Sequence, residues 1–418
     1  MARADAETDQ IRALSRLAFD ELGGAAEGIG RIERAVADRV YWALGPLGRP
    51  VHFVQDAVED RVLAALRSGA RAVGRVADSG LARRPAAVGR SLSSTPPGAA
   101  ALAAINGLIG DVLEREGSAL QEPMAVRVAG RPVALETAAL TDAFPTRTGR
   151  LVVFLHGLME TELSWRLGAR AGRETYGERL ARDLGCTAVY VRYNTGRHIS
   201  ANGRSLSELL AGLVEAWPVE VEQIALVGHS MGGLVSRSAC YQASESGQDW
   251  VQQVRHVVSL GSPHTGAPLE QAVHAASAAL NALPETRPFA AFLRRRSAGI
   301  RDLRQGSLVD EDWQGHDPDA LRAAACAEVP LLEHATHCFV AATVTRSPRH
   351  PIARVVGDCL VLQPSASGRS RRRRIPFRAE DGAHLGGTHH LALLNHPAVY
   401  EHLRRWLATS PQRIAAHV

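Results

Sequence analysis

The first 120 residues place apolar side chains at steps of three and four, the spacing that gathers them on one face of an amphipathic helix. Such stripes run over residues 11–22, 29–44, 51–66 and 102–112. Gly23-Gly24 ends the first stripe and Gly45-Pro46 the second, and these residue types commonly stop a helix. Residues 78–99, rich in Gly, Pro, Ser and Arg, predict a linker. The pattern therefore predicts an N-terminal helical segment, 1–120.

From residue 121 the pattern changes to apolar runs of strand length that alternate with helical stretches. A short hairpin is predicted from 124–128 and 132–135. Further strands are predicted at 151–155, 188–193, 224–227, 254–260 and 338–344, and helices at 177–184, 205–216 and 231–243. The strand runs are rich in β-branched residues, as in central strands covered on both faces. This alternation predicts an α/β fold with a doubly wound, mostly parallel sheet over 121–418.

Between residues 266 and 330 the strand signal disappears. Helical pieces at 269–283 and 289–296 are mixed there with polar loops. We expect a helical lid or cap inserted over the sheet.

Composition narrows the classes of protein that fit. Apolar residues make up 45% of the chain and charged residues 22%, which suits a globular protein with a large core. The net charge of +5 comes from basic residues mostly interspersed with acidic ones, so no nucleic-acid partner is expected. The five cysteines form no C-x-x-C pair, so no metal site is expected. Without an apolar stretch of signal-peptide or membrane-span length, a cytoplasmic protein is expected. Peripheral contact with a membrane or lipid surface through the N-terminal helices stays open.

The segment around Ser230 carries the strongest chemical signal. An apolar strand enters Gly228-His-Ser-Met-Gly232 and a helix-forming stretch leaves it. A serine hydroxyl becomes a useful nucleophile when a tight turn presents it beside a base. Small residues at the two flanking positions allow the chain segments to approach. In this context Ser230 is predicted to be a nucleophile, although Gly-x-Ser-x-Gly alone can simply mark a turn.

An oxyanion site is predicted from two backbone N–H groups. The buried run at 151–155 opens into His156-Gly157, and the loop after such a strand donates an N–H beside that of the residue following the nucleophile. The two residues are Leu158 and Met231.

The base and the acid are sought downstream, in the order Ser, Asp, His. His390 is favoured over His389 because it directly precedes the Leu-x-Leu-Leu that is predicted to begin the last helix, which runs to Trp406. Asp358, in Val355-Val-Gly-Asp-Cys-Leu-Val361, is predicted at the end of an apolar strand. There it would orient the imidazole and stabilise its charged form. The alternative is a structural role, in which Asp358 caps a turn after Gly357.

The succession of motifs over approximately 124–407 resembles that of bacterial lipases and the PGAP1-like group of α/β-hydrolases. The motifs are Phe154-Leu-His-Gly-Leu, Gly228-His-Ser-Met-Gly-Gly, Gly261-Ser-Pro-His-Thr-Gly, Gly357-Asp-Cys-Leu-Val and His390-Leu-Ala-Leu-Leu. The resemblance implies a Ser230-Asp358-His390 triad, an oxyanion hole from Leu158 and Met231, and hydrolysis of carboxylic esters without a cofactor. Cys359 departs from the family pattern, which often has Gly there. The N-terminal helices have no counterpart in the compact secreted lipases.

The sequence leaves the substrate open. An ester or lipid with an apolar acyl chain is expected, and a thioesterase or acyltransferase would use the same triad. A different class, a non-catalytic protein that binds a lipid surface, is the third alternative. The basic run Arg371 to Arg374 fits either a solvated loop or a site for a phosphate head group or anionic surface.

Overall fold

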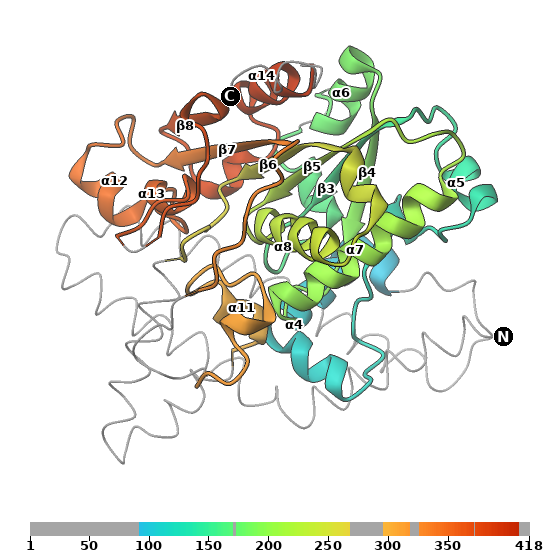
Figure 1. The fold of residues 1–418 in the computed structure, drawn as a ribbon, viewed down its shortest axis with the longest axis horizontal. Coiled ribbons are helices and arrows are strands. Elements are labelled where there is room, and N and C mark those ends of the chain that lie inside the picture. Colours follow the sequence, from blue (N-terminus) through green and yellow to red (C-terminus); the bar gives the residue numbers. More distant parts are fainter. Residues whose placement is uncertain (1–91, 170–172, 268–295, 318–325, 372, 409–418) are drawn as a thin grey trace.

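The computed structural model describes residues 92–169, 173–267, 296–317, 326–371 and 373–408 (Figure 1). The predicted helices at 11–22, 29–44 and 51–66 lie outside the described residues, as does most of the 78–99 linker. The predicted lid helix 269–283 also lies outside them, and so does all but the last residue of 289–296. The division of the chain at residue 120 and the lid over 266–330 therefore stay predictions.

An eight-stranded sheet forms the centre of the described fold (Figure 1). Its order is β2-β1-β4-β3-β5-β6-β7-β8. Strands β3 to β8 pair in parallel, while β1 pairs antiparallel with both β2 and β4. The strands are β1 (Ala125–Val128), β2 (Arg131–Pro132), β3 (Arg150–Leu155), β4 (Thr187–Arg192), β5 (Gln223–His229), β6 (Val254–Leu260), β7 (Thr336–Thr343) and β8 (Gly382–Gly386). The predicted doubly wound, mostly parallel sheet is confirmed, and so is the short hairpin.

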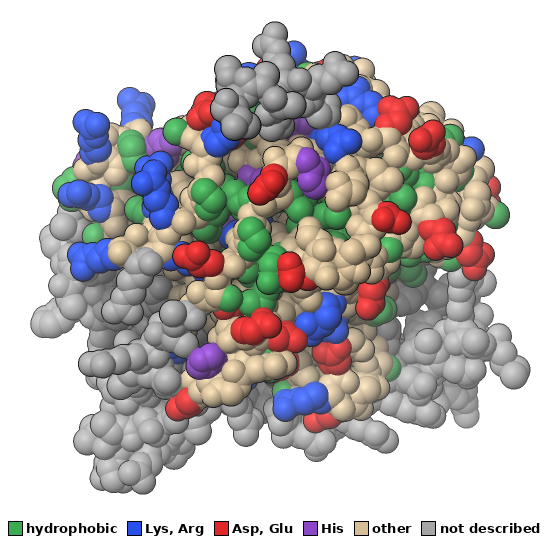
Figure 2. Space-filling model, in the orientation of Figure 1, with side chains coloured by type: hydrophobic (Ala, Val, Ile, Leu, Met, Phe, Trp, Pro, Cys, Tyr) green, Lys and Arg blue, Asp and Glu red, His purple; other side chains and the backbone are tan. Residues whose placement is uncertain are grey.

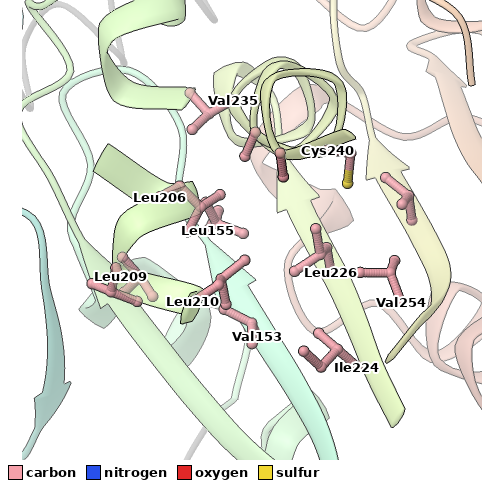
Figure 3. Packing of buried hydrophobic residues seen from close by; sticks show 14 of the residues in the cluster. Val153, Leu155, Leu206, Leu209, Leu210, Ile224, Leu226, Val235, Cys240 and Val254 are labelled. Atoms are coloured by element: carbon pink, nitrogen blue, oxygen red, sulfur yellow. The ribbon is translucent and has the colours of Figure 1, made fainter. Parts of the chain in front are cut away.

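Helices cover both faces of the sheet because alternate residues of each central strand point to opposite faces. On one face, Leu206 and Leu210 of α7 (Ile199–Ala216) point toward Val153 and Leu155 of β3 (Figure 3). Helix α8 (Met231–Glu245) packs on the same face. On the other face, Val152 and Phe154 of β3 belong to one apolar cluster with residues of α6 (Tyr176–Leu184) and α14 (Pro397–Leu407). Two apolar layers therefore hold the sheet.

Shorter helices connect these layers. They are η3 (Leu92–Ser94), α5 (Thr137–Ala143), η4 (Glu162–Arg166), η5 (Asp249–Gln253), α11 (Ala298–Asp302), η7 (Asp310–Asp312), α12 (Pro351–Val356), α13 (Gln363–Ala366), η8 (Ala379–Asp381) and η9 (His390–Leu393). Of these, α11 and η7 lie in the described part of the predicted lid segment.

The last hundred residues differ from the prediction in three places. The apolar strand that was expected to end at Asp358 is wrong, because Val355 and Val356 end α12, which begins at Pro351 behind an N-cap formed by His350. Strand β8 is missed because its residues, Gly-Ala-His-Leu-Gly, include none of the β-branched type. The single last helix is wrong as well. It is split into η9 and α14 because Pro397 lacks a backbone N–H and so starts a helix more readily than it continues one.

Helix α4 (Pro96–Arg115) begins inside the predicted linker, with Thr95 as its N-cap. Its glycines lie against the sheet's loops. A Cβ at Gly107 would come 2.3 Å from Cγ of Met159, and one at Gly110 would come 1.9 Å from Oδ1 of Asn194. Among the described helices α4 alone has the length and apolar composition of a membrane span, yet 61% of that stretch is buried in the fold. That burial is the behaviour of a core helix.

Four buried charged residues tie this first part of the described chain to the sheet edge. Arg192 of β4 makes a two-pronged contact with Glu162, with nitrogen–oxygen distances of 2.6 and 2.7 Å. Its third nitrogen donates to the carbonyl of Ser93 at 2.6 Å. Glu122 accepts from Arg127 of β1 at 2.9 Å and lies 3.6 Å from Arg192. Each of the four charges has a partner of opposite charge, which offsets the cost of burying it.

Removal of one member of this cluster should therefore be strongly destabilising. Because Glu162→Ala leaves the buried Arg192 without its main partner, we expect the free energy of unfolding to fall by about 3–5 kcal/mol. Chemical denaturation monitored by circular dichroism measures this. Glu174→Ala, which removes the exposed partner of Arg182, is the matched control and should change the free energy far less. Equal losses in the two variants would contradict the argument.

Candidate active site

The residues predicted to act together all follow strands at one edge of the sheet. The chain runs from β3 to β4 on one side and then crosses to β5 on the other, so the strand order reverses between β3 and β5. Ligands of open α/β sheets bind at the carboxyl ends of the strands at such a switch point. The loop 156–160 follows β3 and Ser230 follows β5. Asp358 lies beyond β7 and His390 beyond β8.

Ser230 occupies the turn between β5 and α8 in a backbone conformation that side chains rarely adopt, with φ 53° and ψ −120°. The turn is so tight that the residues two positions before and after Ser230 have to be glycine. A Cβ at Gly228 would lie 2.3 Å from the carbonyl carbon of Gly232, and one at Gly232 would lie 2.4 Å from the carbonyl oxygen of Leu155. A strained serine backbone between two glycines is the geometry of a nucleophile elbow.

His390, not His389, lies against Asp358. Its Nδ1 is 2.8 Å from Oδ2 of Asp358, and its backbone N–H donates to the carbonyl of Asp358 at 2.9 Å. Both side chains are buried, whereas His389 is exposed. Burial by itself would lower the pKa of His390, but the charge and hydrogen bond of Asp358, with a further contribution from Glu160, raise it above its usual value. Asp358 thus stabilises the protonated imidazole.

The other imidazole nitrogen of His390 is buried and has no hydrogen-bond partner among the described residues. The ring lies over Gly261, where a Cβ would come 3.1 Å from Nδ1 and Cε1. The N–H of Ser230 donates to the carbonyl of Leu260, the residue before Gly261, at 2.8 Å. Ser230 and His390 therefore both lie at the end of β6. Buried nitrogens without a partner are uncommon in proteins, and Nε2 of His390 is one of several among the described residues.

The loop that carries Asp358 fixes its carboxylate. Oδ1 accepts from the N–H groups of Leu360 and Val361 at 3.0 and 2.8 Å, which leaves Oδ2 for His390. Gly357 and Cys359 on either side have φ values of 62° and 89°. The Cys359 position, where the family often has Gly, thus has the left-handed backbone that favours Gly. The loop keeps this shape in spite of the substitution.

The backbone N–H groups of Leu158 and Met231 donate to no acceptor in the part of the chain that the structure describes. The loop that holds Leu158 is fixed from three sides. The hydroxyl of Tyr193 donates to the carbonyl of His156 at 2.7 Å, and the N–H of Met159 donates to the hydroxyl of Thr195 at 3.2 Å. The third contact is Gly107 of α4 against Met159. The support of this loop by a helix from the N-terminal region was not predicted from the sequence.

One family model matches part of the chain. Residues 146–315 match the model of the PGAP1-like alpha/beta domain. The resemblance predicted from the sequence is thereby confirmed over that stretch, which contains β3 to β6 and the elbow. With the sheet order, it gives the α/β-hydrolase fold that was predicted. No curated protein matches the chain.

Several solved structures are similar to it. The lipase BlEst2 of Bacillus licheniformis in its mature form is 17% identical, over 62% of this chain and 91% of that one, with a TM-score of 0.39. The Pyrobaculum calidifontis esterase is 15% identical, over 64% and 76%, with a TM-score of 0.35. EstA from Clostridium botulinum is 14% identical, over 62% and 87%, with a TM-score of 0.35.

One charged residue of this α/β-hydrolase site was missed from the sequence. Glu160 accepts from the N–H of Gly157 at 2.8 Å and lies 3.1 Å from Nδ1 of His229. The other nitrogen of His229 lies 3.4 Å from the carbonyl of His390. Glu160 and His229 thus join the loop after β3, the turn at Ser230 and the loop that holds His390. An acidic residue directly after Leu158-Met159 was the available signal, but the sequence separation of 69 hid the pairing.

The electrostatic setting of Glu160 keeps it charged. Burial would raise the pKa of this carboxyl, but the charge and hydrogen bond of His229 and the N–H of Gly157 lower it to about 2. A carboxyl whose pKa is lower in the folded state than in the unfolded state stabilises the fold above its unfolded value of 4.5. That stabilisation is lost as the pH falls through the folded value of about 2.

Glu160→Gln should remove this pH-dependent stability. Near neutral pH we expect the variant to unfold with a free energy up to about 3 kcal/mol lower than that of the wild type. The difference should shrink as the pH falls from 4.5 toward 2, where the wild-type carboxyl also becomes neutral. Urea denaturation at a series of pH values measures it. A difference between the two proteins that does not change with pH would contradict the role assigned to the charge.

Proposed function

We propose that this protein is a serine hydrolase that cleaves carboxylic esters, with Ser230 as nucleophile, His390 as base and Asp358 as the acid that orients it. The observation that carries the proposal is the buried His390–Asp358 contact of 2.8 Å, with the second imidazole nitrogen unpaired at the strand end that also holds Ser230. The PGAP1-like match over 146–315 and the elbow geometry support it.

The reaction would proceed by acyl transfer in two steps. With Nδ1 of His390 donating to Asp358, Nε2 is the basic nitrogen and takes the proton of Ser230 as its oxygen attacks the ester carbonyl. The N–H groups of Leu158 and Met231 stabilise the oxyanion, each by about 3 kcal/mol. His390 then protonates the leaving alcohol, and water releases the acyl group from Ser230. Asp358 stabilises the imidazolium formed in between.

Covalent labelling tests the nucleophile and the base. A fluorophosphonate should label the wild type at Ser230, and Ser230→Ala should not be labelled. His390→Ala should lower the rate of ester hydrolysis by about a thousandfold or more. His389→Ala, next to it in the chain but exposed, is the control and should keep most of the activity. Labelling that persists in Ser230→Ala would refute the nucleophile, and an unlabelled wild type would favour the non-catalytic, lipid-binding alternative.

The raised pKa of His390 sets the acid side of the activity profile. Because the reaction needs the neutral imidazole as base, activity should fall as the pH drops below the raised pKa, which lies above 6.5. Asp358→Asn removes the charge that raises this pKa, so the acid side of the kcat/KM profile should move to lower pH. The plateau should also fall by about a thousandfold or more. A profile that keeps its position in Asp358→Asn would contradict the pairing.

Turnover assigns the leaving group. Esters and thioesters of graded chain length, measured with the wild type and with Ser230→Ala as blank, would decide between an esterase and a thioesterase. Esterase activity predicts higher kcat/KM for the oxygen esters, and faster thioester turnover would move the assignment to a thioesterase.

A further inference from the structure

Positive charge is concentrated in one short stretch of the chain. Residues 344–378 contain nine arginines and a single acidic residue, Asp358, which is buried against His390. The stretch therefore has a formal charge of +8, compared with +5 for the whole protein. An excess of this size in thirty-five residues attracts anions over the range of the Debye length.

Six of these arginines form what we term the arginine face. They are exposed and come from the segments on either side of α13, namely Arg346, Arg349, Arg354, Arg369, Arg371 and Arg374. Figure 2 shows basic side chains gathered at the end of the molecule where Figure 1 places α12 and α13. None of the six forms a salt bridge with a carboxylate of the described residues. Their charges are therefore available to an external partner.

Two arginines of the same stretch, Arg373 and Arg378, have partners within the protein. Arg373 turns inward and donates to the carbonyls of Gly306 and Ala327 at 3.4 Å. Arg378 is paired with Glu380 at 2.6 Å. The N–H of Ser370 donates to the carbonyl of Arg373 at 2.8 Å, and Arg371 and Arg374 of this turn are exposed. The fold thus separates structural arginines from the exposed set.

An exposed apolar side chain accompanies the arginines. Val355 of α12 is 60% exposed, more than any other large hydrophobic side chain in the described residues. Apolar residues that enter the headgroup region, flanked by arginines that meet phosphates, are typical of proteins that lie on a membrane. Residues 344–374 contain no Phe, Trp or Tyr, the residues on which single-stranded nucleic acids stack. This composition favours a lipid surface over RNA.

The arginine face also lies beside the candidate active site. The loop that contains α12 starts at the carboxyl end of β7, the same edge of the sheet as Ser230, and ends at Asp358. The N–H of Val344 donates to the carbonyl of Gly357 at 2.9 Å, which closes this loop. Contact through α12 would hold that edge of the sheet near the lipid.

We propose that the arginine face and Val355 form a docking surface for membranes that contain anionic phospholipids. The arginine forks bind the headgroup phosphates, and Val355 enters the interface between headgroups and acyl chains. The binding is independent of catalysis, so Ser230→Ala should bind vesicles as the wild type does. Failure of the proposed hydrolase activity would leave this result unchanged.

Vesicle co-sedimentation of the full chain tests the proposal. The wild type should bind vesicles of phosphatidylcholine mixed with phosphatidylserine, and bind pure phosphatidylcholine at least about tenfold more weakly. The triple variant Arg349→Gln, Arg354→Gln and Arg374→Gln should lose at least about tenfold in affinity for the mixed vesicles. A control variant with Arg115→Gln, Arg131→Gln and Arg166→Gln removes equal charge from exposed positions outside the face and should bind as the wild type does.

Further measurements separate membranes from other anions. Val355→Ser should weaken binding to the mixed vesicles and leave binding to inorganic polyphosphate unchanged. Unaltered thermal unfolding in all variants, and unaltered soluble-ester hydrolysis in the arginine variants and Val355→Ser, would show that the fold is intact. Equal losses in the two triple variants would overturn the proposal. Preferential binding of single-stranded RNA, or displacement from vesicles by an equal concentration of inorganic phosphate, would assign the face to a soluble anion instead.

Discussion

The site depends on one steric constraint, the approach of the start of α8 to the end of β3. At Gly232 a side chain would meet the carbonyl oxygen of Leu155 at 2.4 Å, so only glycine permits the contact. This approach brings the N–H of Met231 and the loop after β3 to the same edge of the sheet. Gly228 allows the chain to turn back on α8, and the strained conformation of Ser230 follows from that turn. Without it, Ser230 and the loop after β3 would lie apart.

Around this contact, two carboxylates are paired with imidazoles. Asp358 faces His390 and two backbone N–H groups, and Glu160 faces His229 and Gly157. Isolated, such charges would be costly to remove from water, whereas paired and hydrogen-bonded they fix the geometry of the loops that carry them. Three buried imidazole nitrogens among the described residues lack a hydrogen-bond partner, on His264, His337 and His390, and of these rings only that of His390 contacts a carboxylate.

The support for the site extends beyond the matched family region. Residues 146–315 match the PGAP1-like alpha/beta domain, but Asp358 and His390 come from the chain after it and α4 from the chain before it. Helix α4 reaches the oxyanion loop through Gly107 and the loop after β4 through Gly110. The described part of the N-terminal region therefore belongs to the architecture of the site. The arginine face similarly uses the chain between β7 and β8, outside the matched region.

The sequence alone determined the central strands, the helices between them and the elbow, because these follow from local rules. Apolar runs form buried strands, and a strand, a small-residue turn and a helix leave Ser230 one conformation. Prediction from the sequence fails where a segment's structure depends on residues outside it. Val355 and Val356 have the composition of a strand but continue the helix that His350 and Pro351 start.

Only the tertiary structure decided that Asp358 meets His390 across 32 positions, and that His389 stays exposed. It also decided that Glu160 pairs with His229 across 69, and that some arginines turn inward while others stay exposed. Such choices depend on which loops the sheet order places together. Hydrogen bonds and charge pairs select partners by distance in space, and the pattern along the chain does not contain that distance.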